Sequence, residues 1–140
     1  MKKIVHVMQI DTSPEDVFLA LTLPDKLASW WTTEVETDVV DAKLDFRFHE
    51  DFNPDMKIVR TEPEREVRWQ CVGGHDAWHE STITFGLEGE NGTTQLTFVQ
   101  SYPKEVDEEA YGRYNFSWGY YLDSLRQFCE TGRGKPFQQV

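Results

Sequence analysis

The chain has 140 residues, of which 39% are hydrophobic and 28% charged, proportions that are ordinary for one globular domain spanning residues 1–140. Aspartate and glutamate outnumber lysine and arginine by 25 to 14, which gives a formal net charge of −11. Such a surface repels phosphate backbones and acidic lipid headgroups, so nucleic-acid binding and stable membrane association are not expected.

The first element is a strand over Lys3 to Ile10, where valine and isoleucine alternate with polar residues. Neither a signal peptide nor an apolar run of membrane-spanning length is seen, so we expect a cytoplasmic protein. In that compartment Cys71 and Cys129 are expected to be buried thiols rather than a disulfide.

Two helices follow the first strand. Ser13 is suited to cap the first helix and Pro14 to occupy its first position, and Val17, Phe18, Ala20 and Leu21 form its apolar side. Because the residue before a proline disfavours helix, we expect this helix to stop before Pro24 and a short second helix to continue to Trp30.

Six strand-like segments come next, separated by turn-forming residues such as Gly73-Gly74 and Asn91-Gly92. Alternation assigns one side of each strand to the interior, and the short connections predict an antiparallel meander. The predicted strands are Thr33–Val40, Leu44–Glu50, Met56–Glu62, Glu66–Val72, Trp78–Glu88 and Thr93–Tyr102.

The last element is a long helix from Asp107 to Thr131, with apolar residues recurring every three or four positions along one face. That face consists of Tyr111, Tyr114, Trp118, Tyr121, Leu122, Leu125, Phe128 and Cys129. The order of elements predicts an α+β helix-grip fold, in which a curved antiparallel sheet of about six or seven strands wraps around this helix.

Motifs along nearly the whole chain resemble the AHSA-like family of the SRPBCC superfamily, which includes START lipid-transfer domains and birch-pollen-allergen-type ligand binders. The matching residues are Ser13-Pro14-Glu15-Asp16-Val17-Phe18, Ala20-Leu21-Thr22, Pro24, Trp30-Trp31, Glu62-Pro63, Val67, Trp69, Ser81-Thr82-Ile83-Thr84-Phe85, Gly92-Thr93-Thr94, Leu96, Trp118 to Leu122, Leu125, Gly132, Gly134 and Pro136. The resemblance implies the helix-grip fold but no particular function, because relatives bind different ligands and some are enzymes.

The chain departs from the family pattern in two respects. Many relatives have glycines where this chain has Asp41-Ala42-Lys43 and Asp55-Met56, so strand boundaries are expected to differ there. The chaperone activators that give the family its name also carry a separate chaperone-binding domain, for which we expect no room here. The family name therefore does not by itself transfer that activity.

One cluster has the residue types of a metal site: His75, Asp76, His79 and Glu80. Histidines four apart pair on a helix, whereas this segment leads into a predicted strand, so a solvated hairpin is favoured over a metal site. No nucleophile or cofactor motif is found, and an enzyme is a less favoured alternative. Acid–base catalysis would require a polar side chain such as His79, Glu80, Tyr114 or Arg68 to face a cavity.

The aromatic residues give the main functional hypothesis. Either they fill the core, or their bulk leaves a cavity between sheet and helix that holds an apolar or aromatic small molecule or a lipid. The candidate ligand-binding residues are Trp30, Trp31, Phe46, Phe48, Trp69, Trp78, Phe85, Phe98, Tyr114, Trp118, Tyr121 and Leu122. The alternative is a protein-interaction module, co-chaperone-like, stress-related or homodimeric, which would expose an apolar patch.

Overall fold

A computed structural model describes residues 2–49 and 51–138, and within these ranges the chain forms one seven-stranded antiparallel sheet and three α-helices. The strands are β1 (Lys2–Ile10), β2 (Glu34–Asp38), β3 (Lys43–Arg47), β4 (Asp55–Glu62), β5 (Glu66–Gly73), β6 (Thr82–Glu90) and β7 (Thr93–Tyr102). The helices are α1 (Pro14–Thr22), α2 (Pro24–Leu27) and α3 (Glu108–Thr131), with a 3-10 turn η1 (Asp76–Trp78).

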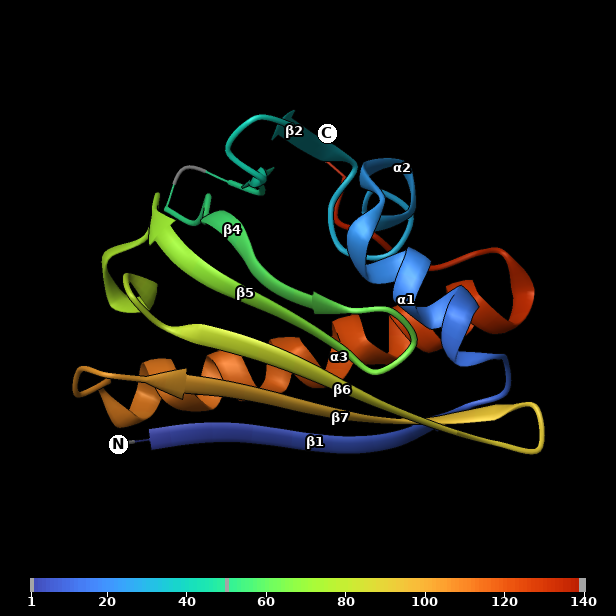
Figure 1. Ribbon diagram of the computed structural model, residues 1–140. Coiled ribbons are helices and arrows are strands. Elements are labelled where there is room, and N and C mark those ends of the chain that lie inside the picture. The colour runs from blue at the N-terminus through green and yellow to red at the C-terminus, as the bar shows by residue number, and fades with distance from the viewer. Residues whose placement is uncertain (1, 50, 139–140) are drawn as a thin grey trace.

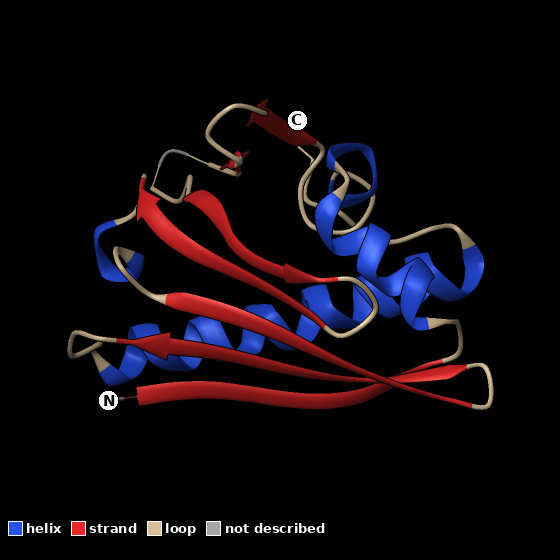
Figure 2. Cartoon of the chain, viewed as in Figure 1, coloured by secondary structure: helices blue, strands red, loops and turns tan. Residues whose placement is uncertain are grey.

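The sheet has the strand order β1-β7-β6-β5-β4-β3-β2 and curves around α3, which runs across one of its faces (Figure 1). The helices α1 and α2 lie together near one end of α3 (Figure 2). The predicted helix-grip fold is therefore confirmed, with α3 held against the concave side of the sheet.

Local sequence explains where the helices begin and end. The Ser13 hydroxyl accepts a hydrogen bond from the amide of Asp16 at 3.3 Å, and Asp107 accepts one from the amide of Ala110 at the same distance. These side chains satisfy amide groups that have no partner inside a helix. Gly132 ends α3 at φ 86°, a left-handed conformation that glycine adopts without strain.

Alternation in the strands correctly predicted which side chains point inward. The inward residues of β3, β5, β6 and β7 are buried: Leu44, Phe46, Val67, Trp69, Cys71, Ile83, Phe85, Leu87, Leu96 and Phe98. On α3 the residues Trp118, Leu122 and Leu125 are buried against them, while the predicted tyrosines of the same face are half-buried. Burying this apolar surface provides the main stabilisation of the fold.

Three predicted boundaries were wrong by three or four residues, and the others lie within two residues of the structure. The strand predicted to begin at Trp78 begins at Thr82, because η1 turns the Trp78 ring into the core and Glu80 takes a left-handed φ of 69°. The strand predicted over Leu44–Glu50 ends at Arg47, and Glu50 lies outside the described residues. The short helix predicted to reach Trp30 ends at Leu27 and continues as turns.

The two segments expected to depart from the family pattern, Asp41-Ala42-Lys43 and Asp55-Met56, are irregular in this structure. Ala42 takes a φ of 54°, although an alanine side chain disfavours that conformation. The pairing of β4 with β5 shifts register between Asp55 and Met56, as in a β-bulge. The backbone is therefore irregular at both places although neither segment contains a glycine.

A buried polar network joins α3 to the sheet. The Gln100 side-chain oxygen accepts hydrogen bonds from the Tyr102 hydroxyl at 2.6 Å and from the Trp118 indole N–H at 2.9 Å. The Gln100 amide donates to the Ser81 hydroxyl at 3.3 Å. Because buried polar groups are costly without partners, this network fixes the position of Trp118 along the sheet.

Replacing Tyr102 with phenylalanine should lower the free energy of unfolding by about 1 kcal/mol, because one buried hydrogen bond is lost while Gln100 keeps Trp118 as a donor. Urea denaturation measures the change. The matched control is Tyr120→Phe, since Tyr120 is exposed and its change should stay within about 0.5 kcal/mol. Equal effects of the two substitutions would show that the network contributes nothing to stability.

Both cysteines are free, and burial raises the pKa of Cys71 to about 11 and that of Cys129 to about 12. These thiols are therefore protonated and weakly reactive at neutral pH. No helix within residues 2–49 and 51–138 has the length and hydropathy needed to cross a bilayer.

Candidate functional site

An open pocket of about 500 Å³ lies between the N-terminal half of α3, the β3–β4 and β5–β6 connections and the chain after α3. Its aromatic lining comprises Trp31, Phe48, Phe52, Trp78, Tyr114, Trp118, Tyr121 and Phe137. The remaining lining residues are His49, Asp51, His75, Arg113 and Ser117. A mostly apolar wall with a few polar groups is the usual composition of a small-molecule site.

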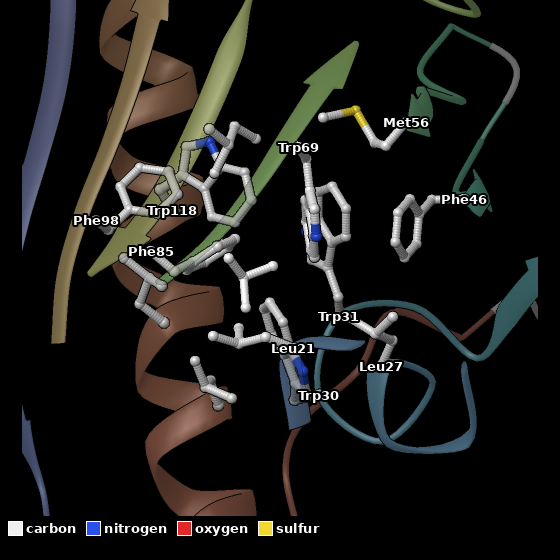
Figure 3. Packing of buried hydrophobic residues seen from close by; sticks show 14 of the residues in the cluster. Leu21, Leu27, Trp30, Trp31, Phe46, Met56, Trp69, Phe85, Phe98 and Trp118 are labelled. Atoms are coloured by element: carbon white, nitrogen blue, oxygen red, sulfur yellow. The ribbon is translucent and has the colours of Figure 1, made fainter. Parts of the chain in front are cut away.

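Trp31 joins the pocket to the core. Its ring is 2% exposed and stacks with Trp118 at a centroid distance of 5.0 Å, with Trp69 at 5.7 Å and with Trp78 at 6.4 Å. Figure 3 shows it between the turns after α2 and the sheet, close to Trp69 and Phe46. Because several rings pack against Trp31, the floor of the pocket is fixed by packing.

Three phenylalanines from two segments, the β3–β4 connection and the chain after α3, form the rim. Phe52 packs against Phe48 at 5.0 Å and against Trp78 at 4.9 Å, while Phe137 packs against Phe48 at 5.6 Å. The segment after α3 is tied down, since the Phe137 amide donates to the Trp31 carbonyl at 2.9 Å. The rim therefore joins the β3–β4 connection to a segment that is far from it in sequence.

The polar contact within the pocket is a hydrogen bond between His75 Nε2 and the Tyr114 hydroxyl at 2.9 Å. Burial lowers the pKa of His75 from its ordinary value of 6.5 and raises that of Tyr114 from 10.0. Both side chains are therefore neutral at pH 7. Gly74, at φ 79°, makes the turn that directs His75 toward α3.

The charged groups lie at the pocket mouth. Asp51 and Arg113 are exposed, and Arg113 is bonded to Glu109 one helical turn earlier. Exposed pairs of this kind contribute little to stability. The interior of the pocket is consequently mostly apolar, and its other polar groups are the His75–Tyr114 contact, the Tyr121 hydroxyl, His49 and Ser117.

Stability should depend on the protonation of His75. The unfolded chain binds a proton at this residue near pH 6.5, whereas the folded chain does so only at lower pH, because burial outweighs the opposing effects of the Asp51 backbone and Asp76. The free energy of unfolding should therefore decrease as the pH falls below about 6.5. The decrease should stop once the pH is below the lowered pKa of His75 in the folded state. Urea denaturation between pH 7.5 and pH 5 measures this loss.

The control for that experiment is His75→Gln, which keeps a polar group beside Tyr114 but cannot titrate. The variant should lose less stability than the wild type over the same pH interval. Identical pH profiles would show that His75 is not the titrating group responsible.

The structure divides the twelve candidate ligand-binding residues equally. Six line the pocket: Trp31, Phe48, Trp78, Tyr114, Trp118 and Tyr121. The other six, Trp30, Phe46, Trp69, Phe85, Phe98 and Leu122, are packed in the buried core. Phe52, Phe137, His75 and Ser117 line the pocket without having been predicted as ligand-binding residues. Phe52 and Phe137 lie in irregular segments where no periodicity exists, so only their aromatic character could have identified them.

The residues considered for a metal site are separated. His75 faces Tyr114, whereas His79 lies on the far side of η1, where its Nε2 is 3.6 Å from Glu80. No group of three or more metal-ligating side chains occurs among residues 2–49 and 51–138. Of the side chains considered for acid–base catalysis, Tyr114 lines the pocket and His79, Glu80 and Arg68 do not.

The family described as "Activator of Hsp90 ATPase homolog 1-like protein" matches residues 11–130. The fold is similar to that of the Aha1 dimer from Colwellia psychrerythraea, with a TM-score of 0.84, 33% identity and coverage of 96% of this chain and 100% of that chain. It is also similar to a protein from Mesorhizobium loti, with a TM-score of 0.76, 22% identity and coverage of 90% and 95%. A third similar structure is CalU16 from Micromonospora echinospora, with a TM-score of 0.72, 21% identity and coverage of 95% of this chain and 76% of that chain. No curated protein matches the chain significantly.

Proposed function

The chain belongs to the family of activator of Hsp90 ATPase homolog 1-like proteins, and we propose that it binds a small apolar or aromatic molecule. Because one fold can serve different roles, this proposal is based on the pocket of this chain and not on the family name. The observation that supports this proposal is the open pocket of about 500 Å³ walled by eight aromatic side chains. We further propose that this binding takes place in the cytoplasm, the location expected from the sequence, and involves no chemical step.

The dimensions and lining of the pocket agree with this role. Its volume lies in the lower part of the range of about 300–1,000 Å³ that ligand pockets commonly have. Burial of about 200 Å² of ligand surface would contribute roughly 5 kcal/mol before the cost of association. The stacked floor around Trp31 is already ordered by packing, so little side-chain entropy remains to be lost on binding.

Blocking the pocket from α3 tests the proposal. Ser117 is exposed and lines the pocket, so Ser117→Trp should fill the space without disturbing the buried core. Asn115 is exposed on the same helix and does not line the pocket, which makes Asn115→Trp the matched control. The probe is N-phenyl-1-naphthylamine, a neutral dye whose fluorescence rises in apolar surroundings.

The wild type and Asn115→Trp should bind the dye, and Ser117→Trp should bind it at least about 10-fold more weakly, the effect of losing roughly 1.4 kcal/mol. Native mass spectrometry of protein purified from cells should also detect a bound small molecule that Ser117→Trp lacks. Equal dye binding by both tryptophan variants, or no binding by any form, would overturn the proposal.

A second candidate function is self-association, because the similar Colwellia psychrerythraea structure is described as a dimer and covers this chain almost completely. The dimer contact would use the outer side of α3, where Phe116 is 79% exposed and Tyr120, one turn later, is 48% exposed. Sedimentation velocity of the wild type and of Phe116→Glu tests this candidate. A wild-type dimer that becomes monomeric in the variant supports it, and a wild-type monomer at high concentration rejects it.

A further inference from the structure

The hydrogen bond between His75 and Tyr114 has a defined direction. His75 is neutral at pH 7, because burial lowers its pKa. Between a neutral imidazole and a phenol, the phenol hydroxyl is the stronger donor and the unprotonated ring nitrogen is the stronger acceptor. A neutral imidazole has one N–H, so Nε2 is the acceptor in the contact of 2.9 Å with Tyr114. The Tyr114 hydroxyl therefore donates its only proton to His75.

This direction leaves the Tyr114 oxygen as a hydrogen-bond acceptor. Within residues 2–49 and 51–138, His75 is the hydrogen-bond partner found for that hydroxyl, and no donor to its oxygen is found. The side chain is half-buried and lines the pocket. An aromatic ligand that lies in the pocket thus meets an acceptor there, whereas Trp78, which packs edge-on against Tyr114, and Trp118, which stacks with Trp78, contribute rings to the wall.

The charges around the pocket disfavour an anionic ligand. The chain has a net charge of −11, Asp51 lies at the mouth, and Arg113 is already bonded to Glu109. The field of the protein and the local groups therefore select against carboxylates, sulfates and phosphates. A neutral group that donates one hydrogen bond is the complementary partner.

We propose that the pocket selects neutral aromatic molecules that carry a hydroxyl or ring N–H, which donates a hydrogen bond to the Tyr114 oxygen while His75 accepts from the Tyr114 hydroxyl. This inference rests on the proposed function, since it specifies the chemical class of ligand for the same pocket. Tyr114 and His75 act here as specificity-determining residues.

The experiment compares 2-naphthol with 2-methoxynaphthalene, which has the same ring system but no donor proton. Both are titrated at pH 7 into the wild type and into Tyr114→Phe, and dissociation constants are measured by calorimetry. Tyr114→Phe keeps the ring that packs at 5.7 Å from Trp78 and removes only the oxygen. The methoxy group also changes size and hydropathy, so one protein alone is not informative. For each protein, the dissociation constant of 2-methoxynaphthalene is divided by that of 2-naphthol, and the wild-type ratio is then compared with the Tyr114→Phe ratio.

The wild type should favour 2-naphthol over 2-methoxynaphthalene about 3- to 10-fold more strongly than Tyr114→Phe does, which is the range for one net hydrogen bond. A control is Tyr120→Phe, which removes a hydroxyl from an exposed tyrosine of α3 that does not line the pocket and should leave the wild-type ratio unchanged. Equal ratios in the wild type and Tyr114→Phe, or a wild-type preference for the methoxy compound that Tyr114→Phe loses, would overturn this inference.

The outcomes separate the inference from the function on which it rests. If both naphthalenes bind and Ser117→Trp blocks both, while the ratio does not depend on Tyr114, the pocket is a ligand site without the proposed donor selectivity. If neither compound binds the wild type at its solubility limit, both the inference and the proposed function are overturned.

Discussion

Replacing Trp31 with alanine is expected to lower the free energy of unfolding by about 3–5 kcal/mol, which is the range for removing a buried tryptophan. The side chain is 2% exposed and stacks with four other tryptophans, so its removal leaves a cavity lined by rings that cannot collapse without losing their own contacts. Urea denaturation followed by circular dichroism measures the loss. Because Trp31 also forms the pocket floor, binding of N-phenyl-1-naphthylamine should weaken as well.

The control for this substitution is Phe116→Ala, which removes an equally hydrophobic ring that is 79% exposed. Exposed substitutions usually change stability by no more than about 0.5 kcal/mol. If the two variants were equally stable, Trp31 could not be the residue that joins pocket and core.

Replacing Gly74 with alanine should be similarly damaging, with a loss of at least about 3 kcal/mol from combined steric overlap and backbone strain. A Cβ atom at Gly74 would lie 2.0 Å from the Asn53 carbonyl oxygen, and the residue has a φ of 79°. The connection before η1 would have to move away from the β3–β4 connection and take His75 with it. The pocket would then lose its polar contact as well as part of its wall.

Gly92→Ala separates the two contributions, because Gly92 has nearly the same φ of 82° but no atom within 4 Å of the added Cβ. It should cost only the strain of the left-handed conformation, about 1–2 kcal/mol. The difference between the variants in urea denaturation isolates the overlap at Gly74. Equal losses would mean that the two connections are not packed as closely as described.

The sequence predicted the fold well because strand alternation and helix periodicity record which side chains face the interior. Leu44 and Phe46 on β3, like Val67 and Trp69 on β5, are buried as that pattern requires. Asn91-Gly92 forms the expected tight hairpin, with both residues at positive φ. Where side-chain packing overrides local preference, as at Trp78, the prediction failed.

The pocket could be predicted only in part, because periodicity identifies inward-facing residues without showing which of them reach an opening. Phe46 and Phe48 illustrate this, since they share a face and both are buried, yet only Phe48 lines the pocket. The pairing of His75 with Tyr114 joins residues 39 apart in sequence, and it depends on the turn at Gly74 and the rotation of α3. Local pattern predicts the turn and the helix face separately, but it does not show that they bring these two side chains together.

The most direct test of the account is a nuclear magnetic resonance titration of the wild type with 2-naphthol, following backbone amide shifts. Ligand binding in the pocket predicts the largest changes at His75, Tyr114, Ser117 and Tyr121, with none at the distant hairpin around Asn91 and Gly92. Changes centred on Phe116 and Tyr120, or no saturable changes at all, would contradict the claim that the aromatic pocket is the functional site of this protein.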